Sequence, residues 1–216
     1  MRITDIRPQK NRPGRDSVYI DGRFAFGLDR ETTLTLKLSP GIELGPEQVE
    51  QIMGEVSRKR AMDAALRLLS YRGRSRKEIS DRLKRLGFSA ELIEQTCRRL
   101  AELGLLNDRQ FAESVARDRL AYARKGHRQI SAELRRKGVP KPLIEQALEQ
   151  AGDETESARA LLAKVGRRYS SLEPRVRYRK LHDLLLRRGF SFETVNRVLS
   201  EEEQRAADAA ESEVEV

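Results

Sequence analysis

Three equally spaced glycines constrain the fold of this 216-residue chain more than any other feature. Gly87, Gly138 and Gly189 stand 51 residues apart, and each closes a Leu-x-x-x-Gly step. Apolar residues also keep the same place eight residues before each glycine, one residue after it and six residues after it. Sequence similarity at such a period is typical of tandem helical repeats, in which each unit packs against its neighbours. The spacing therefore predicts a modular helical array.

Each unit of the array is predicted to contain three helices. In the first unit, Ser75-x-x-Glu78 has the residues of a capping box, and the helix that it begins ends at Gly87, where glycine suits a left-handed backbone. The next helix begins at Ser89, and the second unit opens at Asn107-Asp108 with residues that favour a helix start. The third unit is predicted to begin at Asp153-x-x-Glu156, a second candidate capping box.

The first 45 residues do not share the repeat. Alternating apolar residues surround Asp21-Gly22, which is a signal for a two-residue type I′ hairpin, so we expect a small antiparallel sheet. Leu34, Leu36 and Leu38 also alternate, but Asp29 could cap a short helix there, which leaves strand and helix both open. Gly45-Pro46-Glu47 then favours a helix that joins the sheet to the first unit.

The predicted fold class is mainly α. Three tandem three-helix repeats are expected to form a curved elongated array, preceded by a small antiparallel β segment. The predicted segments are a β extension (1–45), a connecting helix with the first repeat (46–106), the second repeat (107–152), the third repeat (153–203) and an acidic disordered tail (204–216).

Net charge is distributed unevenly along the chain. Residues 1–57 carry a net charge of −1, residues 58–200 carry +16 and residues 201–216 carry −6. The predicted repeats therefore form a cationic body. Such a body attracts phosphate backbones or an acidic protein surface, and the attraction weakens as salt is added.

The sequence argues against an enzyme. It contains no phosphate-binding glycine loop, dinucleotide-binding motif, nucleophile elbow or zinc-protease motif, and His127 and His182 have no metal-ligand partner at a useful spacing. We therefore predict no catalytic residue, no metal site and no cofactor. Cys97 takes a place held by leucine in the other repeats, which predicts a buried apolar side chain.

The same composition bears on where the protein works. No apolar run approaches the roughly 18 to 20 residues of a membrane span, and the first ten residues lack an apolar signal-peptide core. A single cysteine fits a reducing compartment. We therefore expect a cytoplasmic protein without a membrane segment.

Basic residues recur at matching positions of the repeats. Taking ~100° per residue, Lys77 and Lys84 point about 160° and about 140° away from the expected core, and Arg128 and Arg135 take the same places one repeat later. In the third repeat Arg179 keeps the first place, whereas leucine takes the second. A further row stands two residues before each glycine: Arg85, Arg136 and Arg187.

Amphipathic helices all need a solvated face, so no single one of these residues is diagnostic. Repetition across three units, with few matching acids, favours a cationic stripe that binds a partner. The predicted partner-binding or DNA-binding residues are Arg74, Arg76, Lys77, Lys84, Arg85, Lys125, Arg128, Arg135, Arg136, Lys137, Arg179, Arg187 and Arg188.

Three stretches of the sequence closely resemble the bacterial RecX family of recombination regulators. They are the string from Arg74 to Ile79 with Leu83 and Gly87, the string from Leu105 to Ala112, and Lys125-Gly126 with Ile130 and the string from Glu133 to Val139. The resemblance is specific in the first two repeats and looser in the third, and it covers the β segment as an optional extension.

The resemblance implies a non-enzymatic regulator, chiefly an inhibitor, of the RecA recombinase in recombination, DNA repair and the SOS response. Such proteins lie in the groove of the RecA filament on single-stranded DNA. They suppress ATP hydrolysis, strand exchange and the co-protease activity that cleaves the LexA repressor. The partners implied are therefore the RecA filament and, more weakly, DNA itself, with the protein expected to be a monomer.

Two other functions stay open. A nucleic-acid-binding helical-repeat protein acting without RecA would bind bare DNA tightly, with strong salt dependence and some sequence preference. A pure scaffold would bind neither DNA nor the recombinase.

Overall fold

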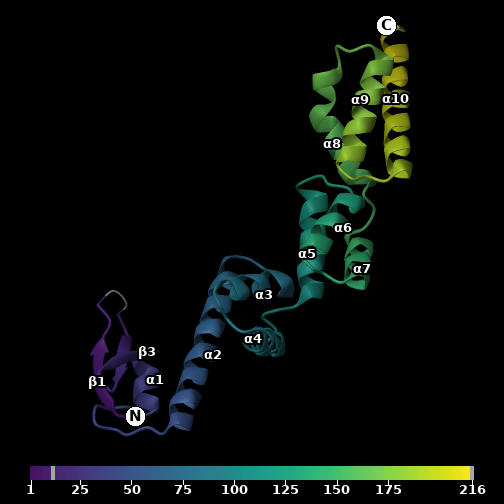
Figure 1. Ribbon diagram of the computed structural model, residues 1–216. Helices are drawn as coiled ribbons and strands as arrows, with labels where there is room; N and C mark the ends of the chain where they lie inside the picture. Colours follow the sequence, from purple (N-terminus) through teal and green to yellow (C-terminus); the bar gives the residue numbers. More distant parts are fainter. Residues whose placement is uncertain (11–12, 215–216) are drawn as a thin grey trace. The chain divides into compact units, whose positions relative to one another are not determined.

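The computed structural model describes residues 1–10 and 13–214, with side chains described through residue 205 (Figure 1). It divides into two compact units. We call Met1–Tyr71 with Arg82–Arg99 the N-terminal unit, and Arg72–Asp81 with Leu100–Val216 the C-terminal unit. The predicted fold class, three-helix repeats preceded by a small antiparallel sheet, is confirmed.

The N-terminal unit begins with a three-stranded antiparallel sheet. Strands β1 (Ile3–Pro8), β2 (Arg15–Ile20) and β3 (Arg23–Asp29) pair in the order of the sequence. Asp21 and Gly22 connect β2 and β3 with φ angles of 50° and 77°, both positive as a type I′ turn requires, so the predicted hairpin is confirmed.

Helix α2 (Pro46–Tyr71) covers this sheet with its first turns. Ile52 and Val56 of α2 join Val18, Phe26 and Leu28 of the sheet in one buried apolar cluster. The helix thus begins at a proline, which favours a helix start, and its buried apolar side chains hold it against the sheet.

The open choice between strand and helix after β3 is settled in favour of helix α1 (Arg30–Thr35). Asp29 stands at the N-cap position but makes no capping hydrogen bond, because its carboxylate pairs with Lys59 at 3.0 Å instead. Leu34 is exposed, whereas Leu36 and Leu38 pack against the sheet cluster. The alternation of leucines therefore reflects a helix and the turn that follows it.

Nine further elements follow α2 in the described part of the chain, and they run along the repeats. Repeat helices are α3 (Arg76–Arg85), α4 (Ala90–Glu102), α5 (Asp108–Ala121), α6 (His127–Arg136), α7 (Lys141–Ala151), α8 (Thr155–Val165), the 3₁₀ turn η1 (Gly166–Tyr169), α9 (Pro174–Arg187) and α10 (Phe192–Val214).

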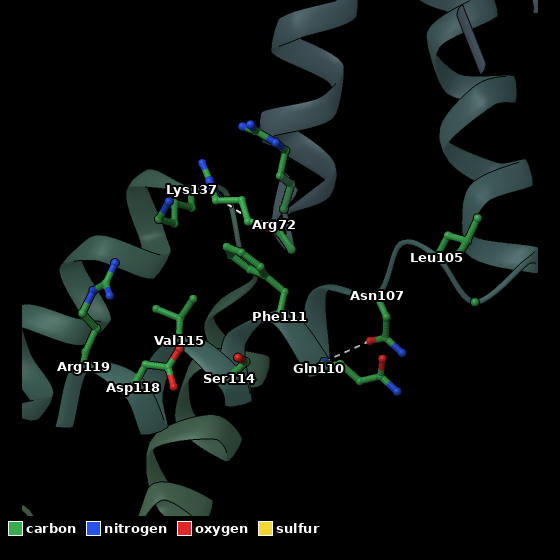
Figure 2. Close-up of a pocket in the computed structure, with 13 residues that line it drawn as sticks. Arg72, Leu105, Asn107, Gln110, Phe111, Ser114, Val115, Asp118, Arg119 and Lys137 are labelled. Atoms are coloured by element: carbon green, nitrogen blue, oxygen red, sulfur yellow. Dashed lines mark hydrogen bonds between the residues drawn. The ribbon is translucent and has the colours of Figure 1, made fainter. Parts of the chain in front are cut away.

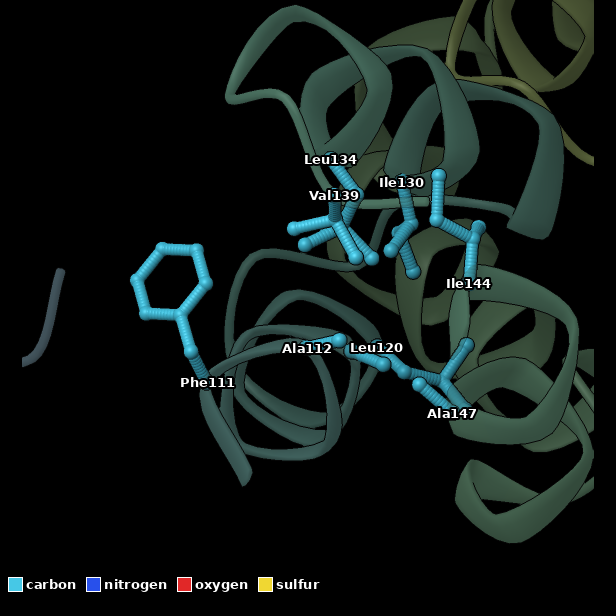
Figure 3. Packing of buried hydrophobic residues seen from close by; sticks show 9 residues of the cluster. Phe111, Ala112, Leu120, Ile130, Leu134, Val139, Ile144 and Ala147 are labelled. Carbon is cyan, nitrogen blue, oxygen red and sulfur yellow. The ribbon is translucent and has the colours of Figure 1, made fainter. Parts of the chain in front are cut away.

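The repeat register is confirmed at the buried positions that it predicted. Leu83, Leu134 and Leu185, each four residues before its glycine, are all fully buried. In the second repeat, Ile130 and Leu134 of α6 pack with apolar side chains of α5 and α7, including Leu120 (Figure 3). Cys97 is also fully buried, as expected from its place in the repeat. Apolar burial on one side of each helix therefore forms the centre of the second and third repeats.

Three of the predicted helix starts in the repeats are confirmed, and the capping box predicted for the third repeat is wrong. Ser89 accepts a hydrogen bond from the Leu92 N–H at 3.3 Å at the start of α4. Ser75 and Glu78 exchange capping hydrogen bonds, both of 3.2 Å, and Asn107 caps α5. At the third repeat, Asp153 accepts a hydrogen bond from the Thr155 N–H, but Glu156 pairs with Arg159. Because α8 begins at Thr155, Glu156 lies in its first turn and does not close a box with Asp153.

The chain after residue 203 differs from the expected disordered tail. Helix α10 continues to Val214, and the last two predicted tail residues, 215–216, lie outside the described residues. Glu201 and Glu202 form ion pairs with Arg159 and Arg177, which fasten this helix to α8 and α9. Alanine and glutamate are also strong helix formers, so the composition that suggested a tail suits a helix equally well.

Candidate partner-binding surface

The thirteen predicted binding residues fall into an exposed group and a half-buried group. Eight are exposed: Lys77, Lys84, Arg85, Arg128, Arg135, Arg136, Arg179 and Arg187. The outward positions predicted from helical angles for Lys77, Lys84 and their equivalents in the later repeats, Arg128, Arg135 and Arg179, are thus confirmed. Five are half-buried: Arg74, Arg76, Lys125, Lys137 and Arg188. Lys84 and Arg85 belong to the N-terminal unit, and the other eleven belong to the C-terminal unit.

The expectation of few matching acids is wrong for at least three of these residues. Lys77 pairs with Asp81 one turn later on α3. Lys125 lies 3.0 Å from Glu133, and Lys137 lies 3.2 Å from Glu78. The reason is that α3 and α6 each carry a glutamate on the side where another segment approaches, so part of the basic set serves the fold.

These two glutamates are held as carboxylates by their neighbours. Hydrogen bonds from Arg119, opposed by burial and assisted by Lys125, lower the pKa of Glu133 to about 2. Burial by itself would raise the pKa of Glu78, but hydrogen bonds from Arg72, the Ser75 N–H and Lys137 lower it to about 2. Both carboxylates are therefore charged at neutral pH.

The first helix-end contact between repeats joins α3 to the end of α6. Ser75 donates a hydrogen bond of 2.6 Å from its hydroxyl to the Lys137 carbonyl, inside the C-terminal unit. One period later, the Gly126 N–H donates to the Arg188 carbonyl at 2.9 Å. The same two repeat positions are thus joined each time, by a side-chain hydroxyl in one case and a backbone N–H in the other, and both bonds place Lys137 and Arg188 at junctions between repeats.

Carboxylates from the following repeat complete two helix starts. The Arg76 N–H at the start of α3 donates to Asp108 at 2.8 Å, and the His127 N–H at the start of α6 donates to Glu154 at 2.6 Å. Glu154 is nearly fully buried and also accepts from the Ser191 N–H at 2.6 Å. A carboxylate at a helix N-terminus satisfies free N–H groups and complements the helix dipole. Asp108 is the first residue of α5, and its carboxylate also caps the N-terminus of α3.

A cavity of about 570 Å³ lies beside α5 in the C-terminal unit (Figure 2). Four basic residues line it: Arg72, Arg74, Arg119 and Lys137. Leu105, Phe111 and Val115 form its apolar part. Phe111 projects toward Arg72 and Lys137, with the Lys137 ammonium 5.7 Å from the ring centroid. Its lining also includes Asp118, the one carboxylate among the residues that surround it.

A second cavity, of about 620 Å³, shares Arg119 and Lys137 with the first. It adds Lys125 and Arg136, together with the paired carboxylates Glu78 and Glu133. The two cavities therefore bring together four of the predicted residues, namely Arg74, Lys125, Arg136 and Lys137. Cationic walls with one aromatic ring suit an acidic peptide or a phosphate backbone.

Sequence reasoning missed Arg72 and Arg119, which line these cavities. The repeat could not reveal them, because the position one period after Arg72 holds Ala123 and the position one period before Arg119 holds Leu68. No sequence signal marks Arg119, because its hydrogen bond to Glu133, fourteen residues later, exists only in the folded chain.

Other candidate chemistry is sparse in the described part of the chain. No group of three or more histidine, cysteine or acidic side chains there could hold a metal ion. His182 stacks on Tyr178 and meets Phe192 edge to face. His127 Nε2 is buried without a hydrogen-bond partner among the described residues. None of the helices described is both long enough and apolar enough to cross a bilayer.

Four family models match the chain in order. They describe the RecX N-terminal domain over residues 1–44 and the first, second and third RecX three-helix domains over residues 61–100, 107–148 and 152–199. Together they cover most of the sequence. The three-helix domains coincide with the segments in which the 51-residue spacing was found.

Curated relatives and solved structures agree with these matches. Regulatory protein RecX of Bacillus licheniformis is 31% identical, with 98% of this chain and 81% of the relative covered. Regulatory protein RecX of Levilactobacillus brevis is 33% identical, with 92% of this chain and 75% of the relative covered. A crystal structure of a regulatory protein RecX has a TM-score of 0.67 and 30% identity over 91% of this chain and 98% of that chain. The crystal structure of RecX from Lactobacillus salivarius has a TM-score of 0.63 and 32% identity over 67% and 96%.

Proposed function

This chain belongs to the RecX family of regulatory proteins, and from that membership we propose that it regulates the bacterial RecA recombinase, mainly as an inhibitor. It binds in the groove of the RecA filament on single-stranded DNA, in the cytoplasm, and catalyses nothing itself. Binding there suppresses ATP hydrolysis, strand exchange and the co-protease activity of the filament.

The basic surface of the repeats is the observation that carries this proposal. Six of the exposed basic residues form no ion pair among the described residues: Lys84, Arg128, Arg135, Arg136, Arg179 and Arg187. They lie on α3, α6 and α9, which are the equivalent helices of the three repeats, so the positive charge recurs along the chain. A filament groove offers phosphate and acidic protein repeatedly, and linked modest contacts add through effective concentration.

The paired residues have a different part in the proposal. Lys125 and Lys137 are engaged with Glu133 and Glu78, so they contribute to a partner contact mainly through the rims of the two cavities. Arg188 donates to the Ala123 carbonyl at 3.3 Å, which holds it at a junction between repeats. We therefore assign the main share of partner attraction to the six residues without ion pairs.

Titration of the protein into RecA assembled on single-stranded DNA tests the proposal. We expect the ATPase rate to fall at protein concentrations equal to or lower than that of RecA. Unchanged ATPase activity across a tenfold excess of protein would contradict the regulatory function. A parallel titration with heat-denatured protein controls for nonspecific loss of RecA or DNA.

Stand-alone binding to nucleic acid is the second candidate function, favoured by Arg128, Arg135 and Arg136, which are exposed on the single helix α6. It predicts tight binding to bare DNA that falls steeply as salt rises, and no effect on the ATPase rate beyond competition for DNA. Raising the DNA concentration at fixed RecA separates the two functions, because excess DNA would relieve simple competition.

A further inference from the structure

A third cavity in the C-terminal unit has a lining unlike the two described above. It has a volume of about 290 Å³ and lies between the end of α5, the end of α8 with η1, and the end of α9. Four of its lining residues are basic and none is acidic: Arg124, Lys164, Arg168 and Arg188. Only Arg188 belongs to the basic set predicted from the repeat. Four positive charges around one cavity, two of them on half-buried side chains and none opposed by a lining carboxylate, favour an anion.

Arg124 is the most unusual residue of this lining. Its φ is +48°, a left-handed conformation that glycine adopts at less cost. Its Nε is buried without a hydrogen-bond partner among the described residues. A strained backbone that carries an unsatisfied buried donor points to a ligand that would satisfy it.

Arg188 and Tyr122 define the sides of the cavity. Arg188 donates one Nη1 hydrogen bond to the Ala123 carbonyl, which fixes the guanidinium while its other N–H groups stay available. Tyr122 is 81% exposed although it is a large aromatic residue at the end of a helix. An exposed ring next to clustered cations offers a stacking surface for a base beside a binding site for phosphate.

We propose that this cavity binds a phosphate group of a nucleotide, with the base stacked on Tyr122. The nucleotide comes either free from solution or as part of a single strand, since both present the same phosphate and base. The cavity volume suits a ligand of this size rather than a folded partner. The inference goes beyond regulation of RecA and is tested in the absence of the recombinase.

Isothermal titration calorimetry with the full chain tests the proposal, using ADP, inorganic pyrophosphate and oligothymidylate as probes. Arg168→Glu is expected to weaken binding of the phosphate ligand at least about tenfold, because it replaces a charge-assisted hydrogen bond with repulsion. Arg167→Glu is the matched control, since Arg167 is the exposed neighbour in η1 and does not line the cavity. We expect it to bind nearly as the unaltered chain does.

Arg124→Gly gives a second variant that should fold. Glycine suits the positive φ, so thermal melting should stay close to that of the unaltered chain while phosphate binding falls. Tyr122→Ala should weaken ADP binding but leave pyrophosphate binding unchanged. Saturable binding of ADP and pyrophosphate identifies a free ligand, whereas binding of oligothymidylate alone identifies a strand. Equal losses in Arg168→Glu and Arg167→Glu, or full binding by folded Arg124→Gly, would overturn the site.

Discussion

At the scale of single residues, burial at the repeat positions gives the most direct prediction. Leu134 is fully buried between α5, α6 and α7, so Leu134→Ala removes apolar contacts and leaves a cavity. We expect the free energy of unfolding to fall by roughly 2 to 5 kcal/mol, measured by urea denaturation. Leu103→Ala, at a half-exposed position, is the control and should cost far less. A loss below about 1 kcal/mol for Leu134→Ala would mean that this register is wrong.

Glu133 gives a prediction on pH at the same scale. Arg119 and Lys125 lower its pKa from 4.5 to about 2 in the folded chain, so the folded state favours the carboxylate. The stabilisation is therefore complete above about pH 4.5 and is lost as the pH falls toward about 2. Glu133→Gln should be less stable at neutral pH and should lose less stability across this range, measured by thermal melting.

Glu145→Gln is the control for the pH series. Glu145 is an exposed carboxylate on α7 that pairs with Lys141 across one helical turn, and such surface pairs contribute little. Its substitution should leave the pH profile of the unaltered chain in place. If Glu133→Gln also kept that profile, the ion pairs around Glu133 would not stabilise the fold.

At the scale of elements, the junction between the second and third repeats depends on one close approach. A side chain at Gly126 would place its Cβ 2.2 Å from the Phe190 nitrogen and 2.3 Å from the Gly189 carbonyl. Gly126 has a φ of −76°, which any residue adopts, so Gly126→Ala tests steric contact without backbone strain. We expect it to destabilise the C-terminal unit by more than ~1 kcal/mol in urea denaturation, because backbone atoms must move apart.

Gly166→Ala is the matched comparison for this junction. Gly166 also has an ordinary φ, −53°, and a Cβ there would meet nothing within 4 Å. We expect it to be neutral or slightly stabilising, since alanine restricts the unfolded chain. Equal effects of the two substitutions would show that the approach at Gly126 does not hold the repeats together.

At the scale of the whole molecule, the charge of the repeats is predicted to attract the RecA filament. Reversal of Arg128 and Arg135 to Glu should leave circular dichroism and thermal melting nearly unchanged, because both are exposed on α6 without ion pairs among the described residues. Inhibition of the RecA ATPase should weaken at least about tenfold, as repulsion replaces attraction toward phosphate or acidic protein.

The control for this reversal carries the same change in net charge at other exposed positions. Arg117→Glu with Lys141→Glu alters residues of α5 and α7 that lie outside the predicted binding set. Inhibition by this control should stay close to that of the unaltered chain. Equal losses in both double variants would indicate a general effect of charge, and full inhibition by Arg128→Glu with Arg135→Glu would place the contact elsewhere.

Local signals in the sequence determined much of this fold. The glycine spacing predicted the repeats and the burial of Leu83, Leu134 and Leu185, because helix ends and apolar faces depend on residues a few positions apart. Asp21-Gly22 predicted the hairpin for the same reason. The helical angles also predicted that Lys77 and Arg128 face outward, although their binding role stays a prediction.

Only the tertiary structure decided which charges serve the fold and which remain available. Glu154 caps a helix 27 residues earlier, and Lys137 pairs with Glu78 across 59 residues, so neither contact follows from local spacing. Arg119 and Arg124 have no basic equivalent at the same position of the first repeat, and their cavities form only where segments distant in sequence meet. Periodicity shows which side of a helix faces outward, but the distance between charges on separate helices is set by how those helices pack.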